Sequence, residues 1–216
     1  MKNKSQIAVL SVLVVFLITV TAVAQQKQNL ELTADELLID DANSEVTATG
    51  NVRFSQANIK LNTDKLIATE ELKIIEAVGD VVVSQLERTL TAHHLKLNTQ
   101  TEIGILTGEA KYQAPDMVIR GKKFNFNLKT GHLIVEEEVY LKNKEEEITA
   151  EAKKLSYSST KQEAVLTGDV VAEKGDRRMT AEKMTIDLET NKIKAEGQTT
   201  LIVPNAQQKQ GDKNGD

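Results

Sequence analysis

The chain has 216 residues, of which 40% are apolar, only 3% are aromatic and none is cysteine. Val, Ile, Leu and Ala must therefore build any interior, and disulfides and thiolate metal sites are excluded. The formal net charge is −5 at pH 7. This charge predicts no nucleic-acid partner, because binding a phosphate backbone requires a basic face.

The N-terminus has the pattern of a secretory signal. Lys2 and Lys4 precede an apolar run from residue 7 to residue 24, which ends Ala22-Val23-Ala24. This predicts a signal peptide over residues 1–24, cleaved after Ala24. The alternative is an uncleaved membrane anchor, because 18 apolar residues can just span a bilayer. Either interpretation places the rest of the chain outside the cytoplasm.

The remainder is organised by a short repeated stretch, first seen as Thr49-Gly50-Asn51-Val52. The same pattern returns with its glycine at positions 50, 79, 108, 168 and 197. A further copy fits between 108 and 168, where Glu137 takes the place of the glycine. Six copies with a period near 29 residues indicate a repeat protein.

Each copy divides into two arms with apolar residues on one face. The arm around the glycine alternates apolar and polar residues, as a half-buried strand does. Its inward positions include Ala48, Val52, Phe54, Leu106, Tyr112, Val135 and Leu141. The preceding arm has inward positions that include Leu32, Ala34, Leu37, Ile39, Phe124, Phe126 and Tyr157. In that arm a step of three, as from Ala34 to Leu37, predicts a bulge or bend in every copy.

Hairpin-length polar segments separate the arms, for example 40–44, 98–101, 113–116, 129–131 and 173–176. We therefore expect an all-β domain over residues 25–204, with about twelve antiparallel strands in six hairpin repeats. Residues 205–216 have nothing to bury and are expected to form a disordered polar tail.

Two further patterns bear on architecture. The repeated glycine is interpreted as a bulge or close backbone approach, because a ligand role would not tolerate Glu137. A column of small residues runs through all copies: Ala34, Thr63, Ala92, Gly121, Ala152 and Ala181. It either leaves a groove between two facing sheets or lets the sheets pack closely, and both alternatives stay open.

No constellation in the chain predicts catalysis. His93, His94 and His132 lack a familiar ligand spacing, and no serine lies in a nucleophile elbow. The acidic runs 136–138 and 145–147 are typical of a solvated edge. We therefore expect no enzyme activity, no cofactor and no metal site.

The repeats carry a resemblance to a known family. The stretches LTADELLID…ATGNVRF, LTAHHLKLN…LTGEAKY and MTAEKMTIDLETNKIKAEG resemble the OstA-like family over roughly Leu30 to Pro204. The closest branch is the periplasmic lipopolysaccharide-transport bridge (LptA-like) branch, with the membrane-anchored LptC-like branch second. The fourth copy departs from the pattern by lacking its glycine.

The resemblance implies a β-jelly roll opened into a V-shaped trough in the periplasm, which shelters the acyl chains of lipopolysaccharide. The inward residues named for the two arms would form this groove. It also implies head-to-tail self-association between inner-membrane and outer-membrane lipopolysaccharide-transport components. The competing hypothesis is a structural β-repeat stalk with a solid core.

Stacking also has a physical reason, since an open array of strands ends in two unpaired edges that recruit other strands. Contact between unlike ends extends into a filament. The edge residues expected to meet a partner are Leu30, Leu32, Thr199 and Leu201.

Overall fold

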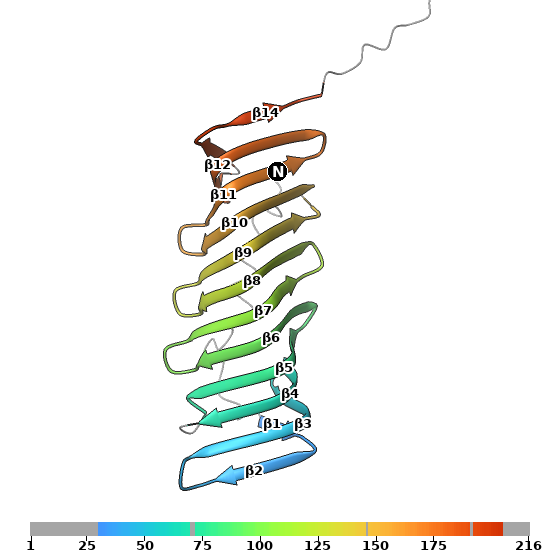
Figure 1. Cartoon of the computed structure of the whole chain (residues 1–216), viewed down its shortest axis with the longest axis vertical. Coiled ribbons are helices and arrows are strands. Elements are labelled where there is room, and N and C mark those ends of the chain that lie inside the picture. The colour runs from blue at the N-terminus through green and yellow to red at the C-terminus, as the bar shows by residue number, and fades with distance from the viewer. Residues whose placement is uncertain (1–29, 70–71, 146, 191, 205–216) are drawn as a thin grey trace, which may run out of the picture.

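The structure is a computed structural model that describes residues 30–69, 72–145, 147–190 and 192–204. In these ranges it is one antiparallel sheet of fourteen strands, stacked in chain order along the long axis (Figure 1). Among the described residues, no helix is long and apolar enough to cross a membrane. The predicted signal peptide and the predicted polar tail lie outside the described residues.

The twelve predicted arms are all present. The strands are β1 (Leu30–Thr33), β2 (Glu36–Asp40), β3 (Glu45–Gln56), β4 (Ile59–Thr69), β5 (Ile74–Gln85), β6 (Arg88–Asn98), β7 (Ile103–Gln113), β8 (Met117–Asn127), β9 (His132–Asn143), β10 (Ile148–Ser158), β11 (Glu163–Lys174), β12 (Arg177–Asp187), β13 (Lys192–Glu196) and β14 (Thr200–Ile202). Strands β3 to β12 are ten unbroken arms. The first arm is split into β1 and β2, which both pair with β3, and the last into β13 and β14, which both pair with β12.

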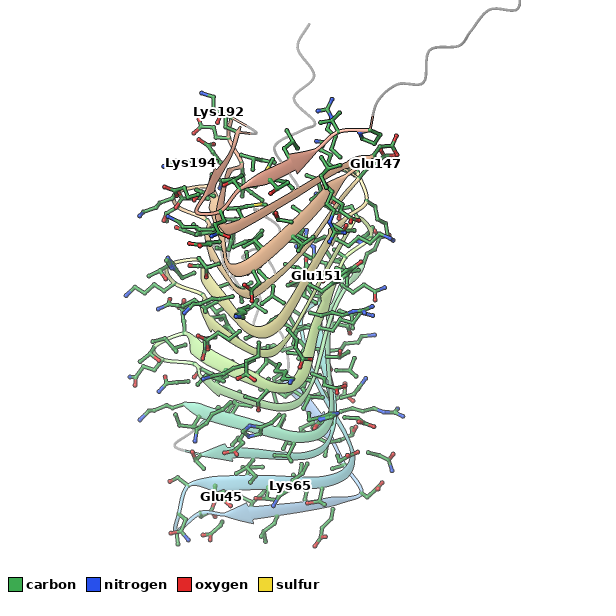
Figure 2. All side chains as sticks on the ribbon, turned by 45° about the horizontal axis from the view of Figure 1, so that its top comes forward. Glu45, Lys65, Glu147, Glu151, Lys192 and Lys194 are labelled. Atoms are coloured by element: carbon green, nitrogen blue, oxygen red, sulfur yellow. The ribbon has the colours of Figure 1, made fainter. Side chains whose placement is uncertain are left out.

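Every pair of neighbouring long strands shifts register in mid-strand, which confirms the expected bend. Between β3 and β4, for example, the register shifts between Thr49 and Val52. The bends align from strand to strand, so the sheet folds along a common line and its strands curve in profile (Figure 2). The two walls are therefore halves of one bent sheet, which corrects the expectation of two facing sheets.

The repeated glycines lie at this corner. Gly168 has a φ of +81°, and a Cβ built on it would lie 2.9 Å from Cβ of Lys153 on β10. Both the backbone conformation and the close approach exclude a side chain, as predicted. The fourth copy makes the same corner without glycine, with φ of +62° at Glu137 and +56° at Glu138. Glu138 there forms an ion pair with Lys122 of β8.

The column of small residues lies on the inner side of the same corner, where the two walls meet. Ala92 and Ala181 are each 5% exposed. A Cβ on Gly121 would overlap the side chain of Val135 on β9. At these positions the column is therefore closely packed along the stack of strands.

Several first arms end in turns with a common chemistry. Asn98 Oδ1 accepts hydrogen bonds from the backbone N–H groups of Gln100 (3.0 Å) and Thr101 (2.8 Å). Asp187 Oδ1 accepts in the same way from Glu189 and Thr190. Short polar side chains that accept hydrogen bonds from backbone N–H groups two or three residues further on favour tight turns. Tight turns connect the long strands without interrupting the stack.

Candidate functional site: the inner face of the bent sheet

The inner face is a continuous apolar surface drawn from every repeat. Because side chains alternate along a strand, one residue in two points between the walls. The resulting core extends from Ala48 near one end to Met184 near the other, and includes Leu106, Val135 and Leu166, each at most 1% exposed. The interior is therefore one core that is shared along the whole stack.

A cavity of about 220 Å³ lies in this interior toward the N-terminal end. Strands β1 and β3 to β8 wall it, and its lining is apolar apart from Gln56 and Thr99. Leu30 and Leu72 belong to the lining and are 42% and 41% exposed, so the cavity reaches the surface beside them. Sites for small molecules typically have volumes of about 300–1,000 Å³. The cavity is thus sized for part of an apolar molecule.

The structure places the fourteen residues predicted for the groove in three settings. Four line the cavity: Leu32, Phe54, Leu106 and Phe126. Seven more are buried in the core outside its lining: Ala48, Val52, Tyr112, Phe124, Val135, Leu141 and Tyr157. The remaining three lie at the N-terminal edge, where Ala34 is half-buried and Leu37 and Ile39 are 50% and 61% exposed. The single groove expected along the chain is therefore open at one end and filled in the middle.

Several cavity residues were missing from the predicted set. They occupy the same inward columns in the second and third repeats: Leu61, Leu66, Ala68, Ile75, Val83, Leu90, Leu95 and Leu97. Their place in the inward columns is the sequence signal that could have identified them. Because this signal is equally strong in every repeat, it does not show which repeats line the cavity.

Two tyrosines fill the middle of the interior. Tyr112 on β7 and Tyr157 on β10 are 0% and 1% exposed. Burial raises the pKa of each hydroxyl to about 12, because the charged phenolate is poorly solvated there. The hydroxyl of Tyr157 is buried without a hydrogen-bond partner. The centre of the trough is thus apolar and closely packed, and the Tyr157 hydroxyl is left unsatisfied there.

A family model described as "LptA/(LptD N-terminal domain) LPS transport protein" matches residues 31–132 and 135–214. The chain belongs to this LptA/LptD N-terminal family of lipopolysaccharide transport proteins. The OstA-like resemblance is thereby confirmed. No curated protein matches the chain.

Solved structures also match. One is LptH of Pseudomonas aeruginosa, described as the LptA homologous periplasmic component of the conserved lipopolysaccharide transport device. The two sequences are 13% identical, the match covers 82% of this chain and 96% of LptH, and the TM-score is 0.26.

The outer face of this LptA-family chain is charged and carries cross-strand ion pairs. Glu136 on β9 accepts hydrogen bonds from Lys154 Nζ (3.2 Å) and Asn125 Nδ2 (3.2 Å). The bond from Lys154 is the main reason that the pKa of Glu136 lies below its usual value. His94, one of the histidines without a familiar ligand spacing, contacts Glu76 Oε1 at 2.8 Å and is about one-third exposed. Such exposed pairs each contribute little to stability.

The family is one of transport proteins, so the chain is not an enzyme. Within the described ranges, no group of His, Cys, Asp or Glu could hold a metal ion. Tyr140 lies on the outer face with the Arg120 guanidinium 5.5 Å from its ring centre.

Proposed function

We propose that the chain binds the acyl chains of lipopolysaccharide against the inner face of its bent sheet and carries the lipid across the periplasm. Membership of a lipopolysaccharide transport family supports lipopolysaccharide as the transported lipid. The observation that carries the proposal is the apolar cavity at the N-terminal end of the inner face. Its lining offers no charged group, which suits an acyl chain.

The energetics explain why such a carrier is needed. Burying one methylene is worth about 0.8 kcal/mol, so exposing a chain of about a dozen costs on the order of 10 kcal/mol. An apolar surface that continues from repeat to repeat makes each step nearly equal in free energy. Direction then comes from an energy-consuming component elsewhere in the pathway.

We further propose that copies stack head to tail between inner-membrane and outer-membrane components of the pathway. The end strands β1 with β2, and β13 with β14, each leave one edge unpaired in the described sheet. The edge residues Leu30 and Leu201 are 42% and 56% exposed. Exposed apolar edges of this kind recruit further strands.

The filled centre favours one competing function, a structural stalk with a solid interior. The transport proposal requires the walls to separate around Val135 and Tyr157 as lipid passes, whereas a stalk requires no such opening. A variant of the transport proposal is a membrane-anchored, LptC-like subunit, which would retain residues 7–24. The intact mass of the exported protein tests that variant, since loss of residues 1–24 excludes an anchor.

The main test is site-specific photo-crosslinking to lipopolysaccharide. Probes at Phe54 and Phe126, which line the cavity, are expected to capture lipid, and a probe at the outward-facing Thr49 is not. A probe at Val135 reports whether the centre opens. Capture at Phe54 no greater than at Thr49 would rule out the conduit and leave the stalk.

A further inference from the structure

Three basic side chains lie at one rim of the inner face. This rim is the end of the inner face that is formed by the turns joining β3 to β4, β5 to β6, β7 to β8, β9 to β10 and β11 to β12. Glu147 lies at this rim and Glu45 at the opposite one (Figure 2). We name the three side chains, at the rim ends of β6, β11 and β12, the rim cations: Arg88, Lys174 and Arg177.

The alternation of side chains along the strands points the rim cations inward. Each lies two residues from an inward apolar residue of its own strand: Leu90 for Arg88, Ala172 for Lys174 and Met179 for Arg177. No other inward position of the described strands holds a charged residue, although the chain has 32 acidic and 27 basic residues. An acidic chain thus places only positive charge at the inward positions of its strands.

Packing does not require a charge at these positions. In other repeats the same columns hold neutral residues: Ile59, Met117 and Ile148 for the two arginines, and Gln56 and Gln85 for the lysine. Lys174 and Arg177 lie directly opposite each other across β11 and β12, and like charges in that arrangement destabilise a sheet. Charge that is placed where neutral side chains fit, at a cost in stability, indicates an anionic partner.

The rim cations flank the closed part of the rim. Ala114, Met117 and Asn143 close its middle, each at most 6% exposed. Arg88 is half-buried on the N-terminal side of this closed part, and the other two rim cations are exposed on its C-terminal side. Five strand spacings of about 4.8 Å separate β6 from β11, so the Arg88 site and the Lys174–Arg177 site lie about 24 Å apart.

Arg88 lies at the edge of the apolar cavity. Leu90, on the same strand and the same face, lines that cavity, and two residues of a strand span about 6.6 Å. Burial raises the pKa of the Tyr112 hydroxyl and the charge of Arg88 opposes that rise, so the guanidinium lies near the hydroxyl. Arg88 therefore lies where the cavity meets the filled centre.

We infer that the rim cations bind the phosphate groups of a lipid whose acyl chains lie against the inner face. This inference rests on the proposed transport function and deepens it by naming the side chains that hold the headgroup. At the Arg88 site the acyl chains occupy the cavity and the phosphate lies at the rim. The apolar and the charged parts of the lipid then each contact protein groups of matching chemistry.

Carboxylates lie near both sites, in turns and not at inward positions of strands. Asp116 acts on the same tyrosine hydroxyl as Arg88, and Glu147 and Asp176 lie in the hollow beside Lys174 and Arg177. A phosphate monoester carries a charge of about −1.5 to −2 at pH 7 and offers three acceptor oxygens. It is therefore a stronger partner for a guanidinium than one carboxylate is.

The test compares two lipids with the same acyl chains: lipid A with its phosphates, and lipid A from which the phosphates have been removed. An equal mixture is offered to the full chain, and photo-crosslinking from Phe54, which lines the cavity, measures the capture ratio. We expect the phosphorylated lipid to be favoured about three- to tenfold, the effect of one charge-assisted hydrogen bond at a partly exposed site.

Substitutions at Arg88 test its part in this preference. Arg88→Met should abolish the preference and still fold, because Met117 occupies the same column. Arg88→Lys keeps the charge and should retain most of the preference. Lys60→Met removes an exposed, outward-facing cation at the same rim and should leave the ratio unchanged. A ratio that Arg88→Met does not change, or that Lys60→Met lowers equally, would overturn the Arg88 site.

The Lys174–Arg177 site is tested with a probe at Met179. Lys174→Gln combined with Arg177→Met should abolish the preference for the phosphorylated lipid at this probe. Arg88→Met should leave it in place, because the two sites are about 24 Å apart. Equal capture of the two lipids at Met179 of the chain with its rim cations intact, or no capture there, would remove Lys174 and Arg177 from the inference.

Inorganic phosphate distinguishes a lipid headgroup from a free anion. At about 1 mM it is expected to leave the capture ratio at Phe54 unchanged, because it has no acyl chain to bury in the cavity. Loss of the preference at this concentration would identify a site for free phosphate and would overturn the inference.

The headgroup site and the transport function fail in different ways. Capture of both lipids in equal amounts at Phe54 would disprove the headgroup site and leave the transport function. Capture of neither lipid, with the chain folded by circular dichroism, would disprove the transport function and the headgroup site with it.

Discussion

The ring of Phe126 on β8 lies over Gly104, its cross-strand partner on β7, where a Cβ on the glycine would overlap the ring. Phe126 also lines the cavity of the inner face. Because Gly104 has no side chain, the Phe126 ring can lie against its backbone. The glycine therefore determines the position of the part of the cavity wall that Phe126 forms.

Gly104→Ala is expected to lower the free energy of unfolding by about 1–3 kcal/mol, because the added methyl displaces a packed ring. Urea unfolding measures the loss. Gly104→Ala combined with Phe126→Leu should lose less than the sum of the two single variants, since the smaller side chain relieves the overlap. Simple additivity would show that the ring does not depend on Gly104.

The architecture could be predicted from the sequence because it depends on position in the repeat. The recurring glycine and the step from Ala34 to Leu37 determine which residues share a wall and where each strand bends. These signals are local, and they are repeated often enough to be read without a structure. The location of the cavity depends on side-chain volume, which varies among repeats.

The same inward columns hold leucine, valine and isoleucine around the cavity in the second and third repeats, but they hold Tyr112 at the end of the third repeat and Phe124 and Tyr157 further along. The larger rings fill the space between the walls, and the smaller side chains leave a cavity. Leu37 and Ile39 belong to inward columns as well. They are exposed because the sheet ends beside them, which column position alone does not reveal.

Leu37 and Leu155 occupy the same column and should respond differently to alanine. Leu155 is 0% exposed, and its replacement is expected to cost about 2–5 kcal/mol of unfolding free energy. Leu37→Ala is expected to change stability by no more than about 0.5 kcal/mol while weakening end-to-end association. Denaturant unfolding and sedimentation separate the two effects. A large stability loss from Leu37→Ala would mean that the edge is covered within a single copy.

The corner of the fourth repeat is predicted to be strained. Glu137 and Glu138 adopt left-handed backbone conformations that cost a non-glycine residue roughly 1–2 kcal/mol each. Glu137→Gly should therefore raise the free energy of unfolding by about 1 kcal/mol, because the exposed side chain of Glu137 contributes little packing. Gly168→Ala is the matched reverse change and should lower it by about as much or more. If both substitutions shift stability in the same direction, the corner does not carry this strain.

Tyr157→Phe removes the hydroxyl that is buried without a partner. Leaving such a group unsatisfied costs about 1–3 kcal/mol, so phenylalanine should stabilise the protein by about 1 kcal/mol at pH 7. Thermal and urea unfolding provide the measurement, with the exposed-face variant Tyr140→Phe as control. A destabilised Tyr157→Phe protein would indicate that the hydroxyl has a partner in solution.

Stability should fall at alkaline pH because of Tyr112 and Tyr157. Their folded pKa values are raised to about 12 from an ordinary value of 10. Between these two values the unfolded chain has lost the phenolic proton and the folded chain still holds it, so rising pH favours unfolding. The contribution of each tyrosine is complete below pH 10 and is lost by pH 12, a loss of at most about 2.7 kcal/mol. Unfolding free energies at pH 9, 10 and 11 should decline less steeply for Tyr112→Phe/Tyr157→Phe than for the unmodified chain. If the unfolding free energies of the two proteins decline equally between pH 9 and 11, the loss of stability comes from lysine ion pairs on the outer face.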